Sequence, residues 1–327
     1  VLQFPSVTFS IIGVSEICFM SSPVGPCDYC CPHDDVLDIQ YKLYTRSNPT
    51  TFELISVGDT ASLRRTRFNV STPTIIYLMG FSEATTGRST TTLRDAYLST
   101  GDYNFVAVDW SRLVAFPWYI SAVRNTRYMG VQLANFVQFL ERVGVTAATL
   151  HVIGFSLGAE AAGFGGKELR RRGLLLGRIT GLDPAYPGYS LTTSDGHLAK
   201  GDAVFVDVLH TNPGVFGFPL PIGDVDFYPN AGQWVQPGCW VDQLARNREL
   251  GFIYGCSHNR AWRLYAESVL NPAGFPATLC PQWKGPRRLC SFRVSGYMGF
   301  GAAGLGVLTG KMYLETNQSP PFARNGP

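Results

Sequence analysis

A serine between two glycines is the feature of this sequence that most directly suggests chemistry. The stretch from Gly154 to Gly158 has the form Gly-x-Ser-x-Gly, with Ser156 at its centre. An apolar run precedes it, and small residues at helical spacing follow it. This order predicts a strand, a sharp turn and a helix, and the turn would raise the serine hydroxyl above the end of the strand. Such a hydroxyl becomes a nucleophile for acyl transfer once a neighbouring base takes its proton.

The two glycines and the following helix explain why this turn suits a reacting serine. Gly154 and Gly158 have no Cβ atom, so the strand and the helix can approach each other closely. The N-terminus of the helix points at the serine and favours negative charge on a developing oxyanion. Open α/β sheets bind ligands beyond the carboxyl ends of their strands. We therefore interpret the stretch as the nucleophile elbow of an α/β-hydrolase; the alternative is a chance Gly-x-Ser-x-Gly in a loop.

A carboxylate must orient the base, and in the α/β-hydrolase fold it follows the serine and precedes the histidine. Asp183 follows a short apolar strand pattern and precedes Pro184, which cannot extend a strand. It is therefore expected just beyond a strand end. Asp207 competes with it but lies inside an apolar run and looks structural. Two further carboxylates fall in an expected loop and stay possible, namely Asp224 and Asp226.

The base has to be one of five histidines. His33 and His151 precede the serine, and His197 lies in an expected loop. His210 ends an apolar strand pattern. His258 stands beside a cysteine and just before a helix pattern, where a disulfide would hold its imidazole in place. The spacing favours His258 over His210 only slightly, and on the residues alone both stay open.

Several longer motifs occur in an order that is typical of one protein family. They are GFSLGA at 154–159, GLDPA at 181–185, DAVFVDVLHT at 202–211, DFYPN at 226–230 and CSH at 256–258. In these motifs, from about Asp38 to Thr316, the chain resembles the animal pancreatic-lipase family. The resemblance is strongest to the insect neutral-lipase and phospholipase A1-like members of that family. It implies a catalytic triad and an oxyanion hole at defined positions.

The triad that this resemblance implies consists of Ser156, Asp183 and His258, which makes His210 structural. The base that the spacing left open is thereby assigned. In this arrangement the serine attacks an acyl carbonyl, the histidine moves the proton and the aspartate orients the imidazole.

The oxyanion hole implied by the resemblance consists of the backbone N–H groups of Phe81 and Leu157. Two neighbouring residues depart from the family pattern, which usually has histidine at both positions. Met79 precedes the Gly-Phe of the oxyanion loop, and Phe155 precedes the nucleophile. Neither change removes a triad group or a backbone donor. Both remove polar groups beside the site, so we expect them to weaken activity.

The stretch 240–255 lies between two cysteines, and the resemblance makes it a lid loop closed by a disulfide. Trp240, Val241 and Leu244 would form one apolar face, which covers the site in water and turns towards a lipid aggregate. The alternative is a disulfide-closed surface loop with no gating. The stretch 212–223, rich in Pro, Phe and Gly, would form the other wall of an acyl groove.

No cofactor and no metal are expected. The calcium loop of pancreatic-type enzymes would fall at 194–202, where Asp202 keeps a ligand type but Ser194 and Ala199 stand where the family pattern has carboxylates. The net charge of +3 is too small to favour nucleic acid as a partner. No apolar run is long enough to cross a bilayer. The expected partner is a lipid substrate or a lipid–water interface, a colipase-type partner is not expected, and the oligomeric state is not predicted.

The eight cysteines cluster near both ends of the chain and predict disulfides in an oxidising compartment. A zinc site in the cysteine cluster 27–31 is the alternative. The chain begins with Val1, which fits removal of a signal peptide. Asn-x-Ser sequons at Asn69 and Asn317 fit a glycoprotein. Together these features predict a secreted, extracellular protein.

The elements that must position the site alternate between strand and helix patterns. Apolar strand patterns occur at 37–46, 52–54, 73–79, 105–110, 148–153, 178–182 and 203–209, and helix patterns at 92–98, 124–143 and after Ser156. This alternation predicts a mainly parallel sheet with helices on both faces, the α/β-hydrolase fold. We expect a disulfide-tied N-terminal arm at 1–35 and a single catalytic domain at 36–327, without the C-terminal β-sandwich of the family.

The function that follows is a secreted serine hydrolase that cleaves carboxylic ester bonds of lipids. Its substrates would be acylglycerols, as for a lipase, or phospholipids, as for a phospholipase A1; the short lid leans slightly towards phospholipids. The alternative is a weakly active or inactive storage or lipid-binding protein with the lipase fold, as in insect yolk. Labelling by a fluorophosphonate probe would separate the two, because the probe reacts with an activated serine and storage needs no nucleophile.

Overall fold

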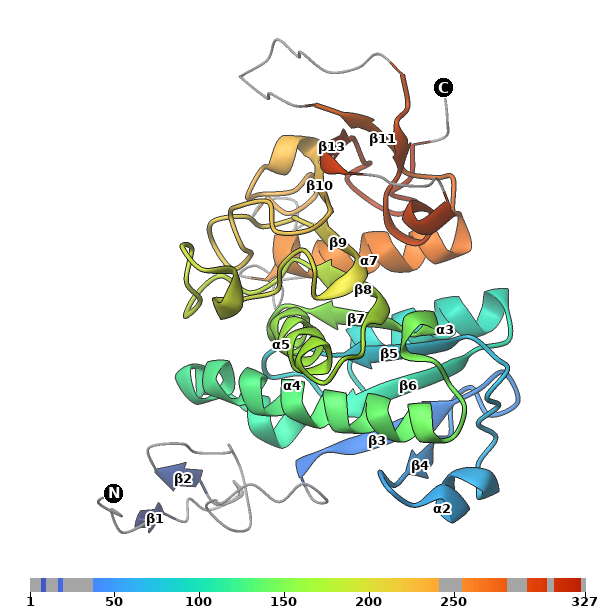
Figure 1. Cartoon of the computed structure of the whole chain (residues 1–327). Helices are drawn as coiled ribbons and strands as arrows, with labels where there is room; N and C mark the ends of the chain where they lie inside the picture. Colours follow the sequence, from blue (N-terminus) through green and yellow to red (C-terminus); the bar gives the residue numbers. More distant parts are fainter. Residues whose placement is uncertain are drawn as a thin grey trace.

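A mostly parallel sheet crosses the molecule (Figure 1). The computed structural model describes residues 7–9, 17–19, 38–240, 255–280, 293–304 and 309–324. Within them, eleven strands form one sheet in the order β12-β11-β13-β10-β9-β8-β7-β5-β6-β3-β4. A separate antiparallel pair joins β1 (Val7–Phe9) and β2 (Ile17–Phe19).

The strands of the large sheet differ in direction between its centre and its edges. Neighbours from β6 through β10 to β13 are parallel, whereas β3, β4, β11 and β12 pair antiparallel at the two edges. The strands are β3 (Gln40–Tyr44), β4 (Glu53–Ile55), β5 (Thr74–Leu78), β6 (Asn104–Asp109), β7 (His151–Phe155), β8 (Leu176–Leu182), β9 (Ala203–Leu209), β10 (Val225–Pro229), β11 (Pro276–Leu279), β12 (Gly296–Tyr297) and β13 (Gly310–Leu314). The mainly parallel sheet of the sequence prediction is confirmed.

Helices cover both faces of this sheet, also as predicted (Figure 1). They are α2 (Thr60–Arg65), α3 (Arg88–Thr100), α4 (Tyr119–Arg142), α5 (Leu157–Arg171) and α7 (Cys256–Leu270). Short 3₁₀ turns are η1 (Ser111–Val114), η2 (Ala147–Thr149), η3 (Ser194–Gly196), η4 (Asn230–Gly232) and η6 (Gly299–Gly304). Helix α4 packs against α5, and α3 packs against α7. None of the helices in the described ranges is both long enough and apolar enough to cross a bilayer.

The pair α4 and α5 illustrates why these sequences pack as they do. The apolar face predicted for α4 is fully buried, including Met129, Leu133 and Phe136. Each such side chain contributes about 1.5–3 kcal/mol on burial. The two helices come close because Gly130 faces α5: a Cβ there would lie 2.6 Å from the Cβ of Phe164. This tight pair sets the direction of α5, the helix that follows Ser156.

One predicted loop is a strand in the structure. Asp226 was expected in a loop but lies in β10, between the parallel neighbours β9 and β13, and is buried. A carboxylate is tolerated there because His210 pairs with it, 2.9 Å away. The alternation of Val225 and Phe227 around it is the strand signal that the aspartate obscured.

Candidate active site

Ser156 stands at a strained turn between β7 and α5. Its backbone has φ 55° and ψ −120°, a region that residues other than glycine rarely adopt. The predicted glycines make the turn possible. A Cβ on Gly154 would lie 2.3 Å from the carbonyl oxygen of Gly158, and one on Gly158 would lie 2.2 Å from that of Leu78. Larger residues would push the strand and the helix apart, so the turn depends on both glycines.

Asp183 follows β8 directly and is fully buried. Its Oδ1 accepts hydrogen bonds from the backbone N–H groups of Thr211 at 2.8 Å and Asn212 at 2.9 Å. Its Oδ2 lies 2.6 Å from Nδ1 of His258 and accepts a hydrogen bond from it. One oxygen therefore fixes the carboxylate to the backbone, and the other holds the imidazole.

His258 lies in the first turn of α7, and its side chain is 13% exposed. Its ring packs against Phe155, with centroids 4.7 Å apart, and against Phe216 at 5.7 Å. The hydrogen bond to Asp183 leaves Nε2 as the ring nitrogen available to a reacting group. This aromatic contact involves Phe155, at the position where the resemblance implied a histidine.

Ser156 and His258 line the same pocket, which has a volume of about 550 Å³. Its apolar wall consists of Phe81, Phe116, Pro117, Tyr119, Phe155, Phe216 and Trp262. Among the described residues, no hydrogen bond joins the Ser156 hydroxyl to His258. Catalytic hydrogen bonds of this kind often tighten only when substrate binds. The pocket thus brings an alcohol, an imidazole and an apolar wall together.

The backbone beside Ser156 presents two N–H groups. The loop after β5 touches the nucleophile, because a Cβ on Gly80 would lie 3.1 Å from the Cβ of Ser156. In the described part of the chain, the N–H of Phe81 meets no acceptor. Leu157 is the first residue of α5, so its N–H has no intrahelical partner. Both amides are therefore open to an acceptor beside Ser156, and their role as an oxyanion hole stays a prediction.

Glu83 fixes this loop and was not singled out from the sequence. Its carboxylate accepts a hydrogen bond from the N–H of Gly80 at 2.9 Å, and the N–H of Ser82 donates to the carbonyl oxygen of Val114 at 2.7 Å. The amides on both sides of Phe81 are therefore held. Burial raises the pKa of Glu83, and the N–H of Gly80 opposes that shift. One signal for its role was present in the sequence, namely that Glu83 follows the Gly-Phe pair by two residues.

Gly217 is a second residue that the sequence analysis missed. A Cβ at this position would lie 2.3 Å from Oδ1 of Asp183, so a side chain there would displace the carboxylate. Gly217 belongs to the stretch 212–223, predicted as a wall of an acyl groove. Phe216 of the same stretch lines the pocket. The loop thus contacts both the acid and the space beside the serine.

The other candidates for the base and the acid, His210 and Asp207, make contacts that stabilise the fold. Both ring nitrogens of His210 are bonded, Nδ1 to the carbonyl oxygen of Phe218 at 3.0 Å and Nε2 to Asp226 at 2.9 Å. Asp207 forms a bidentate ion pair with the buried guanidinium of Arg178, at 2.7 and 2.9 Å. Neither His210 nor Asp207 is among the residues that line the pocket.

The lid prediction falls partly outside the described residues. Cys239 and Cys256 form the expected disulfide. Trp240 is 52% exposed. Val241 and Leu244 lie outside the described residues, as does the cysteine cluster 27–31 for which zinc was the alternative.

Asp202, the residue singled out in the stretch that matches the family's calcium loop, is paired with a lysine. Nζ of Lys167 lies 2.5 Å from its carboxylate and 2.8 Å from the carbonyl oxygen of His197. Burial raises the pKa of Asp202 to about 6, against the lowering influence of Lys167. Within the described ranges, no group of three His, Cys, Asp or Glu residues is arranged to hold a metal ion.

Solved structures and curated relatives resemble this chain. Lipase B of Aspergillus fumigatus aligns with 51% of this chain and 46% of its own at 10% identity and a TM-score of 0.34. Mouse alpha/beta hydrolase domain-containing protein 10 aligns with 57% of this chain and 52% of its own at 14% identity and a TM-score of 0.27. The α/β-hydrolase fold of the chain is evident from its own sheet order and nucleophile turn.

Relatives found by sequence have a higher identity to this chain than these solved structures. Pancreatic lipase-related protein 2 of Bos taurus is 34% identical over 76% of this chain and 55% of its own length. Inactive pancreatic lipase-related protein 1 of Mus musculus is 31% identical over 88% of this chain and 64% of its own. Pancreatic lipase-related protein 3 of Homo sapiens is 32% identical over 88% and 65%. This chain spans about half to two thirds of the length of these relatives.

A family model described as Lipase matches residues 31–322, which is most of the chain. The match contains the serine turn, the Asp183–His258 pair and the loop that ends in Phe81. With this coverage and with relatives above 30% identity, the chain belongs to the lipase family.

Proposed function

We propose that this protein hydrolyses carboxylic ester bonds of lipids through Ser156, Asp183 and His258. One observation carries the proposal: the buried Asp183 carboxylate holds Nδ1 of His258 at 2.6 Å, in the pocket that also contains the strained Ser156. Membership of the lipase family supports an ester hydrolase of the lipase type. The two residues are far apart in the chain, so their contact is a property of the fold.

In the proposed reaction, Nε2 of His258 takes the proton of Ser156 while Oγ attacks the acyl carbonyl carbon. The carbonyl oxygen becomes an oxyanion and accepts hydrogen bonds from the N–H groups of Phe81 and Leu157. His258 then gives its proton to the leaving alcohol, and the acyl group stays on the serine. Water repeats the sequence and releases the fatty acid. One oxyanion donor of this kind contributes about 10²–10³ in rate.

The lining of the pocket supports the proposal that it binds the acyl group of a lipid substrate. Phe, Tyr, Trp and Pro side chains make up half of the residues that line the pocket, and Phe81 packs edge-on against Tyr119 with centroids 5.1 Å apart. Acylglycerols and phospholipids share this acyl portion and both remain substrates in the proposal. A lid formed by 240–255, with Trp240, Val241 and Leu244 on its apolar face, would meet the lipid–water interface.

Secretion is also part of the proposal. It is supported by the disulfide between Cys239 and Cys256 and by the even number of cysteines, because such bonds persist in oxidising compartments. No cofactor enters the proposed reaction, since the triad and two backbone donors supply all its steps. The sequons make the protein a candidate glycoprotein.

A second function is favoured by two observations. Apolar side chains stand at Met79 and Phe155, and a relative with 31% identity is named an inactive lipase-related protein. A lipid-binding or storage protein with little activity would fit both. The intact Ser156, Asp183 and His258 favour the hydrolase, because storage requires none of them.

A fluorophosphonate probe separates the two functions, since it bonds covalently only to an activated serine. The enzyme predicts labelling of the wild type and none of Ser156→Ala. Labelling that persists in this variant, or no labelling of folded wild type, would contradict it. Rates with short-chain esters, triolein and phosphatidylcholine vesicles would then identify the substrate class.

A further inference from the structure

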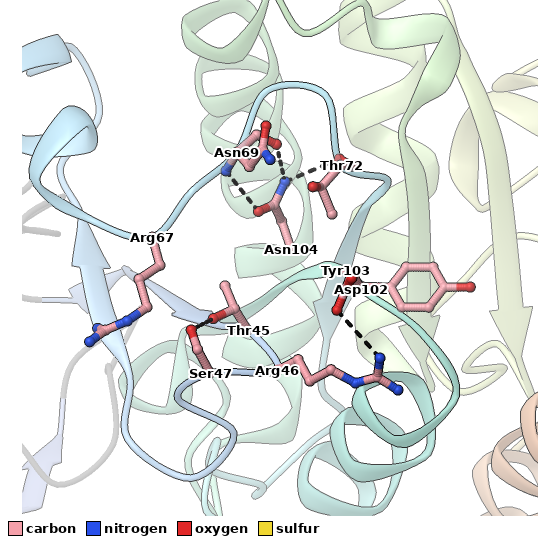
Figure 2. Close-up of a pocket in the computed structure, with 9 residues that line it drawn as sticks. All are labelled: Thr45, Arg46, Ser47, Arg67, Asn69, Thr72, Asp102, Tyr103 and Asn104. Carbon is pink, nitrogen blue, oxygen red and sulfur yellow. Dashed lines mark hydrogen bonds and ion pairs between the residues drawn. The ribbon is translucent and has the colours of Figure 1, made fainter.

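A polar hollow lies at the far end of the strands from the proposed active site (Figure 2). It has a volume of about 400 Å³ and is open to solvent. Figure 2 shows Asn69, Thr72 and Asn104 on one side of it and Thr45 and Ser47 on the other. Asn69 is the first residue of an Asn-x-Ser sequon, so this hollow adjoins one of the two sequons of the chain.

The turn that carries Asn69 is held rigidly. The N–H of Thr72 donates to the carbonyl oxygen of Asn69 at 3.0 Å, and the N–H of Ser71 donates to its Oδ1 at 3.0 Å. Asn104, which is buried, donates from Nδ2 to the carbonyl oxygen of Asn69 at 2.8 Å and accepts from the N–H of Asn69 at 3.1 Å. All of these bonds use the backbone or Oδ1 of Asn69. Within the described residues, its Nδ2 makes no hydrogen bond.

The second sequon differs in this respect. Nδ2 of Asn317 donates to the carbonyl oxygens of Pro321 at 2.9 Å and Ala323 at 3.2 Å. An amide nitrogen that carries a sugar keeps only one hydrogen, so at most one of these bonds would survive. Pro320 also follows Ser319 directly and restricts the backbone of that serine. Thr72 follows Ser71 and imposes no such restriction.

We infer that Asn69 carries an N-linked oligosaccharide and that Asn317 does not. The inference rests on the proposed secretion, which would bring the chain to the glycosylating enzymes. In this step Nδ2 of Asn69 bonds to the anomeric carbon of the first sugar. The bond from that carbon to the diphosphate of a lipid-linked oligosaccharide breaks, and one amide hydrogen leaves as a proton. No hydrogen bond of the folded turn is lost.

The glycan would leave the lipid-binding face uncovered. Asn69 precedes the amino end of β5, whereas Phe81 follows its carboxyl end, and β6 runs parallel beside it. The strand alone separates the two ends by roughly 15 Å. Among the residues that the structure describes, none lines both this hollow and the pocket of Ser156. A sugar chain in front of the hollow can therefore coexist with binding of a lipid aggregate at the opposite end.

The test is expression of the full chain behind a cleavable signal peptide in eukaryotic cells, followed by intact mass before and after peptide:N-glycosidase treatment. We expect one glycan in the wild type and in Asn317→Gln. We expect none in Asn69→Gln or in Ser71→Ala, which keeps the asparagine. The variant Ser71→Thr keeps the sequon and should keep the glycan. If Asn69→Gln does not fold, the two serine variants still decide the result.

Three outcomes would overturn the inference: a chain with cleaved signal peptide and no glycan, a glycan that persists in Ser71→Ala, or a glycan lost in Asn317→Gln. The proposed hydrolase is judged separately. Ser156→Ala should carry the same glycan as the wild type, and Ser71→Ala should hydrolyse esters within about twofold of it. A glycosylated wild type that hydrolyses no ester would therefore contradict the function and leave the glycosylation site intact.

Discussion

Two histidine–aspartate pairs lie near the carboxyl ends of the neighbouring strands β8 and β9, and only the first of them contributes a residue to the pocket of Ser156. In one, His258 meets Asp183 at 2.6 Å; in the other, His210 meets Asp226 at 2.9 Å. Asp183 follows β8, and His210 follows β9. Asp226 lies within β10, and His258 lies in the first turn of α7. By residue type and by distance, the two pairs are nearly the same.

The second ring nitrogen distinguishes them. In His210 it meets the carbonyl oxygen of Phe218, the ring stacks on Tyr228 with centroids 4.5 Å apart, and nothing of the side chain is exposed. In His258 the second nitrogen belongs to a side chain at the surface of the pocket that contains Ser156. A histidine held at both nitrogens stabilises the fold; one held at a single nitrogen can move a proton.

The largest effect is expected at His258. His258→Ala removes the base, and kcat for ester hydrolysis should fall by about 10⁴–10⁶ with little change in KM. Initial rates with a soluble short-chain ester would measure this. A loss below tenfold would show that another group takes the serine proton. The His258–Asp183 pair would then not be the catalytic one.

Asp183→Asn should come next, with a loss of about 10⁴ in kcat, because an amide presents the wrong hydrogen-bonding partner to Nδ1 of His258. The backbone donors of Thr211 and Asn212 still hold one oxygen, so the fold should persist. Circular dichroism and thermal unfolding supply the control. Asp226→Asn is the matched variant, and we expect its kcat to stay within about threefold of the wild type.

Glu83→Ala should lower kcat by about tenfold to a hundredfold. The Gly80 amide loses its acceptor, so the neighbouring Phe81 N–H is less well oriented, while the donor itself remains. Glu83→Gln keeps an acceptor and should recover most of the rate. Equal losses in both variants would indicate that the charge of Glu83, and not its hydrogen bond, is what matters. The test is to measure kcat and KM separately for both variants.

His210→Gln should affect stability and not catalysis. The glutamine cannot satisfy both Phe218 and Asp226 in the same geometry, so the free energy of unfolding should fall by about 1–3 kcal/mol. The kcat of the folded fraction should remain that of the wild type. Urea unfolding and active-site titration with the fluorophosphonate would separate the two quantities. A fall in kcat per labelled site would show that His210 also contributes to catalysis, contrary to this prediction.

The smallest effect concerns Glu160, a buried carboxylate one turn after Ser156 that accepts the N–H of Leu198. Burial raises its pKa from 4.5 to about 8. Its contribution to stability is therefore complete below pH 4.5 and is lost as the pH rises towards and through 8. Glu160→Gln should remove this dependence, with a gain in melting temperature that is small at pH 5 and larger at pH 8.5. An equal gain at both values would contradict the raised pKa.

Local patterns in the sequence were sufficient for the nucleophile turn and for the order of the central elements. Gly-x-Ser-x-Gly encodes the turn because only glycine fits at Gly154 and Gly158. The helix predicted at 124–143 is α4, and the apolar face read from its 3.6-residue period is buried. Such features depend on neighbours in the chain, which a sequence shows directly.

Other features depended on contacts that no local pattern contains. The segment around Asp226 was read as a loop, because its buried partner His210 follows β9 and lies 16 residues earlier in the chain. Glu83 and Gly217 were missed, since their importance lies in one hydrogen bond and in one close approach to Asp183. The residue types at these positions give no hint of either.

Residue types and spacing indicated a serine on a sharp turn, an aspartate after a strand and a histidine before a helix. They did not indicate which histidine meets which aspartate, because spacing along the chain left both His258 and His210 open. Packing makes the choice: it brings α7 to the end of β8, across 75 residues of chain, and buries His210 against Phe218 and Asp226. The physical reason is that hydrogen-bond partners and exposure of a ring nitrogen are set by packing between distant elements.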